Sequence, residues 1–105
     1  MKKTPKAIPA KLRREVKERD NDTCQMCGRP GDSIHHIISS GMGRRRQHFL
    51  TNLVFLCVWC HDRVHNSKDS EKLQRQLEEW AFEKYGEDFT AVKIRAKGWS
   101  WRSAI

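Results

Sequence analysis

The chain has 105 residues, with 21 lysines and arginines against 13 aspartates and glutamates, which gives a formal net charge of +8. This length predicts one domain. Because 37% of the residues are hydrophobic, so short a chain needs more than its apolar core for stability. It lacks a membrane-length apolar run and a secretory signal. We therefore expect a cytoplasmic protein whose charge attracts a polyanion, nucleic acid above all, and no membrane.

The first half of the chain alternates basic segments with short structured ones. Residues 1–8 form a basic arm, and a helix is expected over about 9–20, where a proline suits the first turn. Residues 33–38 are rich in β-branched side chains and predict a strand. A glycine-bearing basic loop follows over residues 39–48. Residues 50–56 are apolar and short, which fits a second strand or a helical turn equally well.

The second half of the chain is expected to be mainly helical. One helix should run to about Asn66, and a longer one should follow over about 69–85 and end at Gly86. Residues 89–105 fit both a strand and a helix. The apolar stripe of the long helix consists of Leu73, Leu77, Trp80 and Ala81.

The four cysteines form two CxxC pairs, Cys24 with Cys27 and Cys57 with Cys60. Reduced thiols in a cytoplasmic protein favour metal over disulfides. Two CxxC turns supply the four tetrahedral thiolates that Zn²⁺ prefers, and such a closed site supports the fold without doing chemistry. The alternative of a classical zinc finger from the second pair and the next two histidines lacks the spacer of about a dozen residues.

Four of the five histidines fall into two groups. His61 and His65 are four residues apart, which places both imidazoles on one face of a helix. His35 and His36 are adjacent on the expected strand, so they share a site only where the strand twists or ends. Three imidazoles around one divalent ion leave positions open for water and phosphate, and a fourth imidazole suits a general base. His48 is expected to be a loop histidine, with a phosphate contact or a ligand role as alternatives.

The order CxxC, His-His, Asn-Leu, CxxC-His and a final His over residues 24–65 resembles the HNH endonucleases. The resemblance implies an α+β fold with a small ββα-metal (His-Me finger) core, a zinc-stapled pair of knuckles and flanking helices. From its lysines and proline we expect residues 1–8 to be a flexible arm, and residues 9–105 to be a single nuclease domain. That domain would consist of the motif core and a helical, C-terminal extension over residues 66–105.

The resemblance assigns a role to each motif residue. His36 falls at the position of the general base, and Asn52 at the central asparagine that pins the loop between the strands. His35, His61 and His65 fall at the ligands of a catalytic divalent ion. The four cysteines match the structural zinc knuckles. Since an all-imidazole site favours transition metals, Mn²⁺ ranks above Mg²⁺, with Ni²⁺ and Zn²⁺ as alternatives.

The implied reaction is one-metal hydrolysis of a DNA phosphodiester, with water activated by His36. One site cuts one strand at a time, so a monomer is expected to nick double-stranded DNA. The three loop arginines are expected to bind phosphate, with a solvated loop as the alternative. They are Arg44, Arg45 and Arg46.

Two other interpretations remain open at this point. A non-catalytic zinc-ribbon module that binds nucleic acid explains the cysteines and the charge, but not the four grouped histidines. An RNA-binding or structural zinc protein shares the same features. Trp99 and Trp101 are expected to pack against the long helix or to stack on bases. A stand-alone enzyme of this kind would fit a bacterium or a phage.

Overall fold

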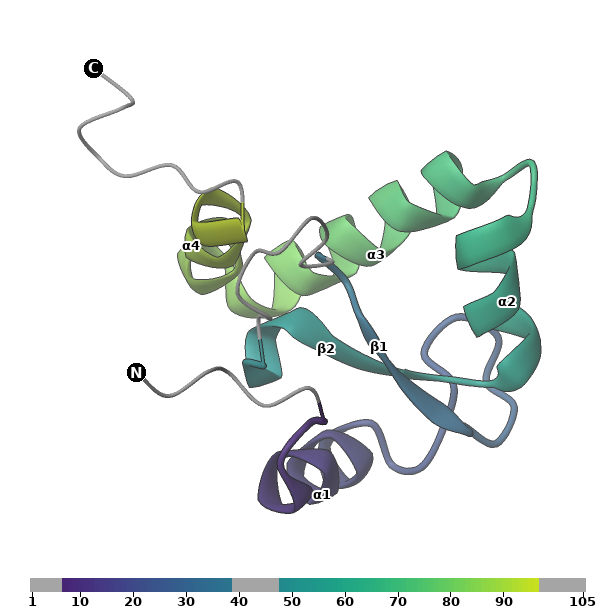
Figure 1. The fold of residues 1–105 in the computed structure, drawn as a ribbon, viewed down its shortest axis with the longest axis horizontal. Helices are drawn as coiled ribbons and strands as arrows, with labels where there is room; N and C mark the ends of the chain where they lie inside the picture. Colours follow the sequence, from purple (N-terminus) through teal and green to yellow (C-terminus); the bar gives the residue numbers. More distant parts are fainter. Residues whose placement is uncertain (1–6, 39–47, 97–105) are drawn as a thin grey trace.

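The fold is known from a computed structural model, which describes residues 7–38 and 48–96. Two short strands and four α-helices make a small α+β structure (Figure 1). In chain order the elements are α1 (Ala10–Arg19), β1 (Ser33–His36), the 3-10 helix η1 (Leu50–Asn52), β2 (Leu53–Leu56), α2 (Val58–Asn66), α3 (Ser70–Tyr85) and α4 (Glu87–Ala96). This architecture confirms the predicted fold class.

The two strands form an antiparallel sheet that is covered on both faces. His35 pairs with Val54 and His36 pairs with Leu53. In Figure 1, α1 lies on one side of the strands and α3 on the other. Successive strand residues point to opposite faces, so every residue of β2 is buried against one layer or the other.

The two layers have separate apolar cores. On the α1 side, Val16 packs with Leu53 and Phe55. On the opposite side, Val54 and Leu56 join the apolar faces of α2, α3 and α4. The expected stripe of the long helix is confirmed, because Leu73, Leu77 and Ala81 are buried in this second core and Trp80 packs against it half-buried.

A buried ion pair at the end of α1 connects these layers. The Arg19 guanidinium contacts the Asp20 carboxylate through two nitrogens, at 2.7 and 2.8 Å. Arg19 also donates to the carbonyl oxygen of Leu50 (2.8 Å) and to the hydroxyl of Tyr85 (3.0 Å). Asp20 accepts the backbone N–H of Phe55 at 2.9 Å. Two neighbouring residues thus join α1 to η1, β2 and the end of α3.

Two local expectations needed the structure to resolve them. Residues 50–56 contain both a helical turn and a strand, in that order. The C-terminal segment is helical from Glu87 and follows Gly86, whose φ of 57° lies in the left-handed region that glycine tolerates. The expected helices over about 9–20, to Asn66 and over 69–85 are all present.

The strand expected over residues 33–38 is shorter in the structure and ends at His36. The backbone N–H of Ile37 donates to the carbonyl of Asn52, and that of Ile38 donates to the Asn52 side chain. The first bond continues the register of the strand pair by one residue, whereas at Ile38 the Asn52 side chain takes the place of a partner strand. Most of the arm over 1–8, most of the basic loop over 39–48, and Trp99 and Trp101 lie outside the described residues.

We expect Asp20→Asn to destabilise the fold strongly. The Asp20 side chain is 1% exposed, and removing one member of a buried ion pair costs about 3–5 kcal/mol of unfolding free energy, because the remaining charge stays buried without its partner. Equilibrium unfolding in urea, followed by circular dichroism, measures this change.

Lys17→Ala is the matched control, because it breaks an exposed ion pair on the same helix. The Lys17 ammonium lies 3.8 Å from the Asp22 carboxylate, and the two side chains are 54% and 74% exposed. Exposed pairs contribute about 0–1 kcal/mol. Equal losses for the two variants would contradict the structural role of the Arg19–Asp20 pair.

Candidate metal centre

The four cysteines meet in one cluster beside the sheet. Their Sγ atoms all lie within 4.8 Å of one another, and Cys27 and Cys57 approach to 3.6 Å. All four are free thiols; Cys27 is exposed, whereas Cys24, Cys57 and Cys60 are buried. The convergence of four thiols at this range fits a closed, tetrahedral zinc site. The cluster expected from the two CxxC pairs is therefore present.

Backbone hydrogen bonds shape both knuckles. In the first, Gly28 adopts a φ of 80° and its N–H donates to the Cys24 carbonyl, while the Cys24 N–H donates to the Arg29 carbonyl. In the second, Cys57 is the N-cap of α2, and its Sγ accepts the N–H of Cys60 at 3.4 Å. The second knuckle is thus also the start of the helix that carries two of the candidate histidines.

The environment of the cluster favours a thiolate at Cys24 and a protonated thiol at Cys27 and Cys60. Burial alone would raise the pKa of Cys24, but hydrogen bonds from the backbone of Cys57, Cys27 and Met26 lower it to about 7. Burial and the neighbouring thiols raise the pKa of Cys60. Since thiolates are the form that binds metal, a bound cation would release the protons that Cys27 and Cys60, whose pKa values are raised, retain.

A second cluster brings together His35, His61 and His65. One ring nitrogen from each lies within 4.8 Å of the others. The ring of His35 is about equally far from the other two, with centroids 5.1 Å from each and interplanar angles of 73° and 75°. β1 supplies one imidazole and α2 supplies the other two, one turn apart. The three residues predicted as catalytic-metal ligands are therefore neighbours in the structure.

His35 provides the test of whether a metal fits there. Its side chain is buried, at 4% exposure, and its Nε2 is the buried side-chain polar atom, among the described residues, that no hydrogen-bond partner reaches. Burial, and then the imidazoles of His61 and His65, lower the pKa of His35 to about 3. The ring is therefore neutral near pH 7, and a buried neutral imidazole with an unpartnered nitrogen, beside two further imidazoles, suits a transition-metal ion.

Ser33 holds the second ligand in place. Its Oγ lies 2.6 Å from the Nδ1 of His61. If Nε2 of His61 binds a metal, Nδ1 carries the proton and donates it to this hydroxyl, which fixes the ring and its tautomer. Sequence reasoning did not single out Ser33, because the contact joins residues 28 positions apart.

His36 lies at the end of β1, between two depressions in the surface. One depression is shared with His35 and His65, and the other lies along α1. The Nε2 of His36 is 3.0 Å from the Nδ1 of His48. The strand ends here, which meets the condition for adjacent histidines to border one site, and His48 is a partner of the predicted base.

Asn52 is fully buried and pins the segment after β1. Its Oδ1 accepts the N–H of Ile38 at 2.8 Å, and its Nδ2 donates to the Ile38 carbonyl at 3.1 Å. This geometry corresponds to the pinning role expected for the central asparagine. The other candidate group, Arg44, Arg45 and Arg46, lies outside the described residues.

Comparison with protein families identifies the segment that carries both clusters. Residues 24–67 match the family model of the HNH endonucleases. The resemblance is therefore confirmed over these residues. The HNH segment, residues 24–67, contains all four cysteines and the five histidines, together with Asn52. Its family indicates a nuclease that binds nucleic acid, and its two clusters indicate metal binding, with structural zinc at the cysteines.

One curated protein is similar over part of the chain. The mitochondrial DNA mismatch repair protein mutS homolog of Sarcophyton glaucum is 36% identical over 53 residues. The match covers 47% of this chain but 5% of that protein. The similarity therefore concerns a small part of a much longer chain.

Within residues 7–38 and 48–96, none of the helices has the length and apolarity needed to cross a membrane.

We expect Cys57→Ser to abolish zinc binding and unfold the protein. Serine preserves the N-cap of α2 but not the thiolate, so the change isolates the metal. Structural zinc contributes about 10–16 kcal/mol in small domains, whereas whole domains are stable by about 5–15 kcal/mol. Zinc content by atomic absorption and far-UV circular dichroism measure both effects. His65→Ala should retain zinc and helicity, and a zinc-free Cys57→Ser protein with a native spectrum would contradict a structural metal.

We also expect Ser33→Ala to weaken metal binding at the histidine cluster by about 10–100-fold, because it removes the partner that orients His61. Titration calorimetry with Mn²⁺ measures this affinity directly. Ser67→Ala is the matched control, since the Ser67 hydroxyl donates to the Arg63 carbonyl at the end of α2. If both serine variants bind Mn²⁺ as tightly as the unaltered protein, Ser33 does not position a ligand.

Proposed function

We propose that this protein is a metal-dependent endonuclease that hydrolyses phosphodiester bonds in double-stranded DNA. The observation that carries the proposal is the buried His35, which has an unpartnered Nε2 and whose ring lies beside those of His61 and His65 within an HNH segment. A zinc-ribbon module needs the cysteines but has no use for a buried neutral imidazole beside two others. The unpartnered nitrogen of His35 therefore favours the enzyme over the binding module.

Each candidate residue has a place in the proposed reaction. His35, His61 and His65 would hold a divalent ion, which when bound supplies positive charge toward a phosphate oxygen and the leaving oxygen. His36 borders this cluster and takes a proton from the attacking water. The contact with His48 holds the ring of His36 in one orientation, and Asn52 maintains the turn after the strand.

The ligand set ranks the catalytic ions. Three imidazoles contribute no charge and are softer than carboxylates, so Mn²⁺ is favoured over Mg²⁺, while Ni²⁺ and Zn²⁺ also suit nitrogen ligands. One such cluster acts on one strand per binding event. A monomer therefore nicks the duplex, and Arg44, Arg45 and Arg46, just before His48 in the sequence, contribute phosphate contacts.

We expect His36→Ala to lower the cleavage rate by about 10²–10⁴-fold, because it removes the general base. The measurement is conversion of supercoiled plasmid to open circles with Mg²⁺, Mn²⁺, Ni²⁺ or Zn²⁺ in separate reactions. His36→Ala should still bind Mn²⁺ in calorimetry, whereas the control His65→Ala should lose both Mn²⁺ binding and cleavage.

Three outcomes would revise the proposal. Simultaneous loss of Mn²⁺ binding and cleavage in His36→Ala would make His36 a ligand instead of a base. Linear plasmid as an early product would replace the nicking monomer by paired cuts. Plasmid binding without cleavage, with every ion, would favour the zinc-ribbon module.

A further inference from the structure

A second groove meets the candidate site from the side opposite the histidine cluster. It has a volume of about 660 Å³ and lies between α1 and β1. Arg13, Arg14 and Lys17 line it from α1, and Ser33 and His36 line it from β1. Arg13 and Lys17 are one helical turn apart, and Arg14 is three residues from Lys17, so the three side chains share one face of the helix.

The charges of this groove are available to a ligand. The side chains of Arg13, Arg14 and Lys17 are exposed. Among the described residues, no carboxylate pairs with Arg13 or Arg14, and Lys17 makes the exposed pair with Asp22 already described. Asp32 brings one carboxylate to the described lining. Three cations against one anion leave the groove positively charged.

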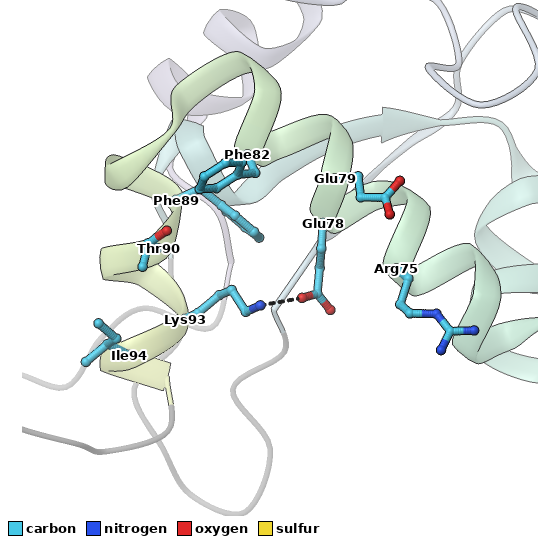
Figure 2. Close-up of a pocket in the computed structure, with 8 residues that line it drawn as sticks. All are labelled: Arg75, Glu78, Glu79, Phe82, Phe89, Thr90, Lys93 and Ile94. Carbon is cyan, nitrogen blue, oxygen red and sulfur yellow. Dashed lines mark ion pairs between the residues drawn. The ribbon is translucent and has the colours of Figure 1, made fainter. Parts of the chain in front are cut away.

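Another groove, between α3 and α4, has no such surplus of positive charge. Figure 2 shows Arg75 and Lys93 there together with Glu78 and Glu79. The Lys93 ammonium lies 2.9 Å from the Glu78 carboxylate, which neutralises it. A phosphate in that groove would meet as many anions as cations, so the unpaired positive charge belongs to the α1 groove.

His36 connects the α1 groove to the histidine cluster, because it lines both depressions. We propose that the α1 groove binds the phosphodiester backbone of the DNA strand to be cut, with Arg13, Arg14 and Lys17 on successive phosphates leading to His36. This inference rests on the proposed endonuclease function and adds a substrate-binding surface to it. Guanidinium and ammonium groups on phosphate oxygens fix register without reading sequence.

The test compares two triple variants with the same loss of charge. The groove variant combines Arg13→Ala, Arg14→Ala and Lys17→Ala. The control combines Lys11→Ala, Lys72→Ala and Arg75→Ala, which removes three exposed cations outside the α1 groove. Alanine is the best helix former, so both variants should fold. Circular dichroism and zinc content confirm that they do.

Fluorescence anisotropy of a short labelled DNA duplex, without added divalent ions, gives the affinity over a range of salt concentrations. The slope of log K against log salt is negative, and its magnitude should fall by about 2.7 in the groove variant, because three phosphate contacts are lost. The control should keep the slope of the unaltered protein. In cleavage assays the groove variant should raise KM while kcat changes little, because the histidines are intact.

The outcomes separate this inference from the proposed function. If the unaltered protein binds and cleaves DNA but the two triple variants lose equal affinity, the groove assignment is overturned and the nuclease stands. If the slope falls in the groove variant alone but no ion supports cleavage, the groove stands and the nuclease is overturned. If the unaltered protein does not bind DNA, both are overturned.

Discussion

The buried pair of Arg19 and Asp20 is the contact on which the rest of this structure depends. It lies where α1 ends, and it forms hydrogen bonds with backbone groups of η1 and β2. Arg19 also stacks against Trp80, with its guanidinium carbon 5.1 Å from the ring centroid. Because β2 fixes the register of β1, the position of every histidine on β1 depends on this pair. In a chain with so small a core, the Arg19–Asp20 pair helps to hold together elements that larger domains hold together with more buried apolar area.

The two adjacent histidines of β1 lie on opposite faces of the sheet. Strand alternation sends His35 toward α2 and places His36 at the edge facing α1. The cysteine cluster fixes where α2 starts, and the helical repeat then presents His61 and His65 together. In the proposed function, structural and catalytic roles would thus be separated by ligand type, with thiolates at the closed site and imidazoles at the open one.

The features that sequence predicted correctly are those encoded within a few residues. CxxC spacing, the one-turn spacing of His61 and His65 and the stripe on α3 each follow from local geometry. Residues 50–56 were ambiguous because a segment so short has too few periods to separate a strand from a helical turn. The early end of β1 could not be foreseen, since it is caused by Asn52, which is 14 residues from Ile38.

The contacts that sequence could not provide join distant parts of the chain. Arg19 reaches Tyr85 across 66 residues, and His36 meets His48 through a fold that no motif describes. The α1 groove was equally hidden, because basic residues on a helix indicate a solvated face until a neighbouring strand forms the opposite wall. The family resemblance named the residues of the reaction, whereas the surface that leads to them required the structure.

The position of α2 has a consequence for inhibition. This one helix begins within the cysteine cluster and continues into the histidine cluster, with Cys60 and His61 as direct neighbours. If the cysteine cluster holds structural zinc, its withdrawal would therefore displace His61 and His65 although neither residue is altered. If Mn²⁺ serves the proposed reaction, a zinc-selective chelator should still abolish activity, and resupply of Mn²⁺ alone should not restore it. Dependence on structural zinc and the identity of the reactive ion would then be separate properties of the proposed enzyme.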